Sequence, residues 1–162
     1  MFLNMDWEIK IGSYKLGLLS GCEIHRSVDL LAATCTISLP GSAYNQALKI
    51  EDYIKRGDKV SVSLGYNGQL NQEFNGYLHT IHTDDGKLTL DCEDELFTFR
   101  KNVADNQFSK TTIKDIVTYC LSQIRSTLKL DCTLTIDYDK FVISKAQAYD
   151  VLKKLKEETK AN

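Results

Sequence analysis

Two histidines of this sequence have a spacing that occurs among metal ligands. His79 and His82 are three residues apart. They fall in residues 74–82, whose composition and pattern predict a β-strand, and residues three apart on a regular strand point to opposite faces of a sheet. Without a bulge the two rings cannot share one ion. We therefore interpret them as ordinary strand residues and predict no metal site.

A dense acidic group is the second place where chemistry could occur. It consists of Asp91, Glu93, Asp94 and Glu95. Paired carboxylates can act as general acid and base or hold a hard cation, but the spacing is not that of a calcium-binding loop. A solvated turn, or a helix start where negative charge suits the helix dipole, explains the group better. A further possibility is that Asp94 bonds local backbone and holds the turn into Leu96 and Phe97.

The cysteines do not form a metal-binding or disulfide pattern. They are Cys22, Cys35, Cys92, Cys120 and Cys132. Their number is odd, no CxxC spacing occurs, and each lies in an apolar or alternating run. We interpret them as buried free thiols in a reducing compartment, with a disulfide framework or a zinc site as the alternative.

Known catalytic motifs are missing from the sequence. It contains no glycine-x-serine-x-glycine elbow, phosphate-binding loop, dinucleotide-binding motif or zinc-protease motif. Because no nucleophile is paired with a base, we predict that the chain is not an enzyme and needs no cofactor. An enzyme built on the acidic group remains the least favoured alternative.

Composition narrows the function classes further. The chain has 162 residues, of which 43% are hydrophobic and 26% charged, as in ordinary globular proteins. The formal net charge of −2 argues against a broad nucleic-acid surface. No run approaches the roughly 20 apolar residues of a membrane span. The first residues lack the cationic and apolar regions of a signal peptide, so we expect none.

The elements that must position these residues are mainly strands. Apolar and polar residues alternate over residues 7–11, 33–39, 60–66 and 88–92. This pattern predicts half-buried antiparallel strands. Turn residues separate them, including Asn67-Gly68 and Asp85-Gly86, which favour hairpins. Several short strands at this spacing predict a small antiparallel β-barrel or a sandwich.

The longest predicted strand, residues 74–82, changes phase along its length. Phe74 and Leu78 are expected on one face, and Tyr77 and Ile81 on the other. Gly76 is expected to mark a bulge or a sharp bend.

Helical patterns begin after about residue 105. Apolar residues over 113–124 recur with helical period, and Thr112 with Asp115 resembles a capping box. A strand is expected at 132–138, and a second helix from Ser144, as N-cap, to about residue 159. We therefore predict a β-barrel domain at 1–105 and an incomplete α+β region at 106–162. The fold class is α+β, mainly β.

The order of short motifs resembles the phage baseplate hub family, also called late control D proteins. This family includes the hub half of the valine-glycine-repeat spike proteins of type VI secretion. The motif residues in this sequence are Gly57, Asp58, Gly65, Tyr66, Phe74, Gly76 and Asp94. In the family's first barrel, a Gly-Asp turn opens a strand, a phenylalanine-x-glycine lies on the next strand, and an aspartate closes the barrel.

The resemblance continues into the second half of the chain. Residues 112–116 resemble the family's first helix after the barrel, and 141–152 its strand-to-helix step. Two features depart from the family: Ala146-Gln147 stands where a threonine is more typical, and the second barrel of a complete hub is lacking. We therefore expect the chain to be the N-terminal part of a longer protein.

The resemblance implies a structural component of a phage-like tail or contractile injection system, forming part of a ring around a central channel. It further implies a trimeric hub in the full-length protein, with tail-tube and spike proteins as partners. Neither sequence-specific nucleic acid nor a membrane is expected as a partner. Assembly is expected in the cytoplasm, followed by residence in the virion tail or injection apparatus. The alternative is a non-enzymatic β-barrel binding module for carbohydrate or peptide, which a deep cleft with convergent polar groups would favour.

Overall fold

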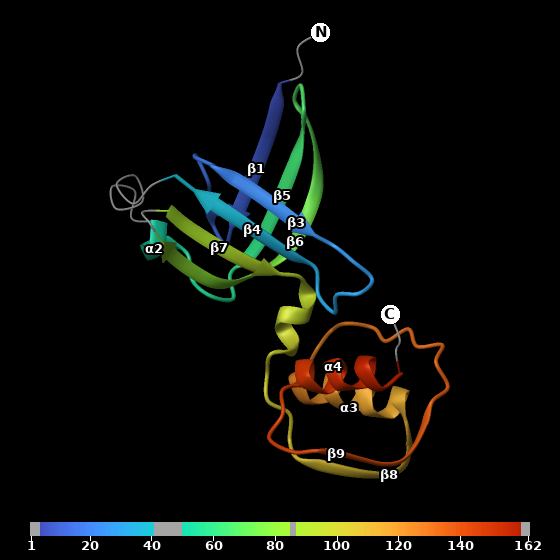
Figure 1. Cartoon of the computed structure of the whole chain (residues 1–162). Coiled ribbons are helices and arrows are strands. Elements are labelled where there is room, and N and C mark those ends of the chain that lie inside the picture. The colour runs from blue at the N-terminus through green and yellow to red at the C-terminus, as the bar shows by residue number, and fades with distance from the viewer. Residues whose placement is uncertain (1–3, 41–49, 85–86, 160–162) are drawn as a thin grey trace. The chain divides into compact units, whose positions relative to one another are not determined.

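The chain divides into a β-rich unit and a smaller α+β unit. The computed structural model describes residues 4–40, 50–84 and 87–159. The compact units are Met1–Phe97 and Thr98–Asn162. The first is built from strands and the second alternates strands with helices (Figure 1). This architecture confirms the α+β, mainly β class that the sequence predicts.

Seven antiparallel strands form the sheet of the first unit. They are β1 (Met5–Ile11), β2 (Tyr14–Lys15), β3 (Gly21–His25), β4 (Thr34–Leu39), β5 (Lys59–Tyr66), β6 (Gln69–Asp84) and β7 (Lys87–Glu93). Their spatial order is β2-β1-β5-β6-β7-β4-β3. A short helix, α2 (Ile50–Tyr53), precedes β5, and the 3₁₀ helix η1 (Glu95–Phe99) follows β7. The alternating segments identified in the sequence are all strands.

The hairpin between β5 and β6 follows from its turn residues. Asn67 and Gly68 have φ angles of 52° and 82°, which the two-residue turn requires. The Gly68 N–H also donates to the Asp6 carboxylate at 2.7 Å, so β1 fixes the turn. The other predicted hairpin turn, Asp85-Gly86, lies outside the described residues.

Strand β6 joins the two halves of the sheet over one core. Its first part pairs with β5 and its second part with β7. Figure 1 shows β3, β4 and β7 lying across β1 and β5. The core between the halves contains fully buried side chains from most strands, among them Ile9, Ile37, Val62, Phe74 and Leu90. Packing of these apolar faces against each other supplies the main stabilisation of the unit.

Two bulges in β6 decide which of its side chains face the core. Register shifts make Glu73 and His79 the extra residues opposite β5 and β7. An extra residue reverses the alternation beyond it. Leu78 and Ile81 therefore both pack on the core, and the expectation that Ile81 shares the face of Tyr77 is wrong.

The sheet does not close into the barrel that the sequence predicts. In the described part of the chain β2 and β3 are its two edges, and no ladder joins them. The bend of β6 already lets both halves cover one core, so closure by hydrogen bonds is not needed to bury the apolar faces.

The second unit is a two-stranded sheet with two helices. Its elements are β8 (Asn106–Thr112), α3 (Ile113–Ile124), β9 (Asp137–Ile143) and α4 (Ala148–Thr159). Both helices lie on one side of the β8–β9 pair (Figure 1). Helix α3 begins with the predicted capping box: Thr112 Oγ1 accepts from the Asp115 N–H, and the Asp115 carboxylate accepts from the Thr112 N–H.

Two sequence expectations for this unit are wrong. The strand predicted at 132–138 is β9, which begins only at Asp137 and pairs with β8. Helix α4 begins at Ala148 rather than after Ser144, because Lys145 adopts a left-handed φ of 48° that a helix cannot include. The Gln147 N–H donates to the Asp150 carboxylate at 3.1 Å, which places the N-cap at Gln147.

Candidate functional site

One corner of the first unit gathers several of the residues that carry the family resemblance. The Lys55 N–H donates to the Asp58 carboxylate at 2.9 Å, and the Asp58 N–H donates to the Lys55 carbonyl at 3.0 Å. Gly57 supplies the positive φ of 92° in this turn. The Gly57 N–H then donates to the Leu78 carbonyl, and the Leu78 N–H to the Asp58 carbonyl, both at 2.8 Å. The Gly-Asp turn is thereby fastened to β6.

Gly76 lies at the same corner, where β6 changes its partner from β5 to β7. A Cβ atom at Gly76 would lie 2.2 Å from the Glu93 carbonyl oxygen and 2.9 Å from the Asp94 Cα. Only glycine permits two backbones to approach so closely. The expected bulge is therefore not at Gly76 itself but on either side of it, at Glu73 and His79.

Asp94 holds the chain where it leaves β7. Its carboxylate accepts the Leu96 N–H at 2.9 Å and the Ala33 N–H at 2.8 Å. Its own N–H donates to the Ala33 carbonyl at 3.0 Å. One aspartate thus joins the end of β7 to the residue before β4.

An aromatic cluster covers this corner. The rings of Tyr77 and Phe97 stack with centroids 5.4 Å apart, and His79 meets Phe97 edge-on at 5.9 Å. The Arg56 guanidinium lies 5.4 Å from the centre of the Phe97 ring. The Tyr77 hydroxyl donates to Glu95 at 3.2 Å, and burial is the main cause that raises its pKa. These contacts hold η1 on β6 and use His79 as a packing residue.

His82 lies apart from His79 and binds a carboxylate. Its Nε2 is 2.7 Å from Asp91 Oδ2, and the Thr36 hydroxyl donates to the other Asp91 oxygen at 3.1 Å. A nucleophilic triad needs the hydroxyl on the imidazole, whereas here it is on the carboxylate. Although the bulge at His79 removes the geometric objection to a shared ion, the two rings have different partners. No group of three or more metal-binding side chains occurs among the described residues.

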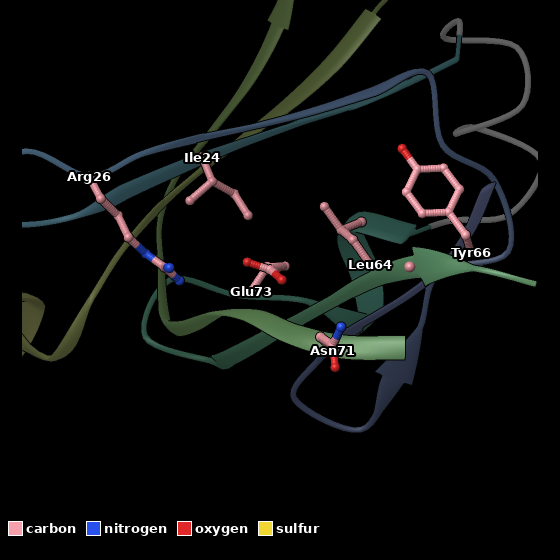
Figure 2. A pocket seen from close by; sticks show the side chains of 7 residues that line it. Ile24, Arg26, Leu64, Tyr66, Asn71 and Glu73 are labelled. Atoms are coloured by element: carbon pink, nitrogen blue, oxygen red, sulfur yellow. The ribbon is translucent and has the colours of Figure 1, made fainter. Parts of the chain in front are cut away.

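Two further motif residues, Gly65 and Tyr66, line a hollow beside the β5–β6 hairpin. Its volume is about 490 Å³. The lining residues are Ile24, Arg26, Leu64, Gly65, Tyr66, Asn71 and Glu73. Figure 2 shows the charged ends of Arg26 and Glu73 pointing into the same part of the hollow, beside the apolar Ile24 and Leu64. Phe74, in contrast, is buried in the core.

Gly65 has the same role at the hollow that Gly76 has at the corner. A Cβ atom there would lie 1.7 Å from the Gln69 carbonyl oxygen. The glycine therefore lets the two strands of the hairpin coil tightly around each other.

The sequence analysis did not predict that two cysteines lie close together. Cys22 Sγ and Cys35 Sγ are 3.7 Å apart, although 13 positions separate them in the chain. Strand β3 was not predicted, because its segment Gly-Cys-Glu-Ile-His is short and flanked by weak signals. Recognising that Cys22 and Ile24 alternate with polar residues would have given the strand.

Comparisons with known proteins show the fold. No protein-family model matches the chain, and no curated protein matches its sequence. The 43 kDa tail protein of prophage MuSo2 from Shewanella oneidensis is 16% identical, with a TM-score of 0.58 over 94% of this chain and 49% of that protein. A tail protein from Neisseria meningitidis MC58 is 12% identical, with a TM-score of 0.53 over 91% of this chain and 44% of that protein. The chain thus has the fold of about half of these tail proteins.

Proposed function

We propose that this chain is a structural component of a phage-like tail. The observation that carries the proposal is the fold shared with two phage tail proteins over both units of the chain. No helix in the described ranges is long and apolar enough to cross a lipid bilayer. A role as an assembly component, rather than as an enzyme, is further supported by the corner of Gly57, Asp58, Gly76 and Asp94, whose hydrogen bonds and close contacts hold backbone together.

The more specific part of the proposal is a place in the baseplate hub, as part of a ring around the central channel. The support is the motif order described above, together with the sheet edge at β3, which no strand covers in the described part of the chain. Unpaired backbone groups at an edge can bind a neighbouring chain. In this proposal the full-length protein is a trimer that contacts tail-tube and spike proteins. It assembles in the cytoplasm and then resides in the tail.

Particle composition tests this function. Tails purified from cells that produce the chain should contain it, and antibody labelling should place it at the baseplate end of the tube. Deleting its gene should abolish complete tails, and restoring the gene should recover them. Gly76→Val, which breaks the corner, should not rescue, whereas Gly17→Ala should, because open space surrounds that glycine. Complete tails that assemble without the chain would refute the proposal.

A binding module for carbohydrate or peptide is the second candidate, and the hollow of Figure 2 is the observation that favours it. Titration of glycans and short peptides into labelled protein, followed by NMR, would test it. Saturable shifts confined to the hollow and abolished by Leu64→Arg would favour this function, while unchanged spectra would count against it.

A further inference from the structure

Cys22 and Cys35 form a close thiol pair at the edge of the first unit. They lie on the neighbouring strands β3 and β4, where Cys22 is opposite Ile37 and Cys35 is opposite Ile24. The two cysteines are therefore diagonal neighbours on one face of the sheet, with their sulfurs 3.7 Å apart. Cys35 is fully buried, whereas Cys22 is half-buried. Cys22 is therefore the more exposed residue of the pair.

We propose that Cys22 and Cys35 are a site of reversible oxidation, at which a small disulfide such as oxidised glutathione converts the two thiols into a Cys22–Cys35 disulfide. The inference does not depend on the proposed function. It assigns Cys22 as the thiol that attacks and Cys35 as the thiol that completes the bond.

The electrostatics of the pair favour this order. When Cys22 is a thiolate, the Cys35 thiol 3.7 Å away can donate to it, and this hydrogen bond is the main cause that lowers the pKa of Cys22. The same hydrogen bond, with burial, raises the pKa of Cys35. Since a thiolate is the nucleophile, Cys22 reacts first. Once Cys22 is bonded to glutathione it no longer holds the Cys35 proton as a thiolate, and the largest cause of the raised Cys35 pKa is gone.

The reaction proceeds by two exchanges. The Cys22 thiolate attacks one sulfur of the glutathione disulfide; that S–S bond breaks, and a glutathione thiolate leaves with the electron pair. Cys35 then loses its proton to solvent and attacks Cys22 Sγ, which expels the second glutathione thiolate. Two protein thiols are oxidised, and one glutathione disulfide is reduced to two glutathione molecules.

The position of β3 at the edge of the sheet allows the Cys22–Cys35 bond to form. The sulfurs must move from 3.7 Å to about 2.05 Å. In the described residues β3 pairs only with β4, so it can shift without breaking a second ladder. The other buried thiols are less suited to begin the reaction. Burial raises the pKa of Cys92 to about 12 and that of Cys120 to about 11.

Oxidation of the whole chain tests the site. Protein in a buffer of oxidised glutathione is digested without reduction, and the linked peptides are identified by mass spectrometry. We expect one Cys22–Cys35 link, loss of two maleimide-reactive thiols, and reversal by dithiothreitol. The bond should raise the melting temperature of the first unit by about 10–20 °C, because it closes a loop of the unfolded chain.

Variants that each lack one cysteine provide the controls. Cys22→Ser should abolish both the link and the melting shift, and Cys22→Ala repeats the test if the serine variant folds poorly. Cys132→Ser, which removes a thiol of the second unit, should leave both unchanged. Stable glutathionylation of Cys22, a Cys35–Cys92 link between directly opposite residues, or no oxidation at all would each overturn the proposal.

Discussion

Replacement of Gly76 by alanine tests the backbone contact at the corner of the first unit. The new Cβ atom would lie 2.2 Å from the Glu93 carbonyl oxygen and 2.9 Å from two further backbone atoms of β7 and its exit. Ordinary contacts of a Cβ begin at about 3.4 Å. Because all three obstructing atoms are backbone, no side chain can rotate away, and β6 and β7 must separate.

The cost follows from that separation. Overpacking in a well-packed region costs about 1–3 kcal/mol. The displacement also strains the pairing of Tyr77 with Glu93, and each hydrogen bond lost adds about 1 kcal/mol. We therefore expect Gly76→Ala to reduce the free energy of unfolding by about 3–5 kcal/mol. In a unit of this size the melting temperature would fall by about 10–25 °C.

Urea and thermal unfolding, followed by circular dichroism, measure this loss. Gly21→Ala is the matched control, because Gly21 also lies in a strand and its Cβ would meet nothing closer than 4.0 Å. The control should unfold within about 0.5 kcal/mol of the wild type. If Gly76→Ala matched that control, the close approach of the two backbones would be refuted.

Three further predictions concern packing, the exit of β7 and pH. Leu90→Ala should lower the free energy of unfolding by about 3–5 kcal/mol, since Leu90 is fully buried, and Leu64→Ala by about half as much, because Leu64 borders the hollow. Equal losses in urea unfolding would contradict this assignment. Asp94→Ala should lower the free energy of unfolding by about 2–3 kcal/mol, because the N–H groups of Ala33 and Leu96 lose their acceptor, whereas Asp94→Asn, which keeps an acceptor oxygen, should cost less. Calorimetry of both variants checks this order. Hydrogen bonds from Lys10 and Lys15 lower the pKa of Glu8 to about 2, so the stabilising contribution of the ionised carboxylate is present above pH 4.5 and is lost as the pH falls toward 2. NMR titration should give this low pKa, and 1 M salt should move the pKa back toward 4.5.

Sequence patterns predicted the elements whose stability comes from local alternation or capping. Strand β4 alternates apolar and polar residues along its whole length, and α3 has a complete capping box. In both, the side chains that decide the structure are neighbours in the sequence, so one segment contains the information.

The features that were missed depend on pairing between distant segments. Strand β8 has polar residues at most positions and is a strand because β9 pairs with it. The bulge at His79 becomes visible only in the register with β7, and it returns Ile81 to the core. The prediction of a closed barrel was wrong for a similar reason. Alternation shows that a strand has one buried face, but it does not show whether the two edge strands of the sheet meet.

The site residues divide in the same way. The turn of Gly57 and Asp58, which is part of the family resemblance, could be read from the sequence because a Gly-Asp turn is local. Other contacts join strands that are distant in the sequence. Gly76 lies close to Asp94, and Cys22 close to Cys35, but no local sequence pattern predicts either contact.

The bonds of Asp94 decide how the first unit bears mechanical tension. A pull on the chain beyond Phe97 reaches Asp94 before it reaches β7, and Asp94 is tied to Ala33 through both its backbone and its carboxylate. The load is therefore divided between β7 and the start of β4 from the outset. Two neighbouring strands resist the pull together, so the last strand is not peeled away one hydrogen bond at a time.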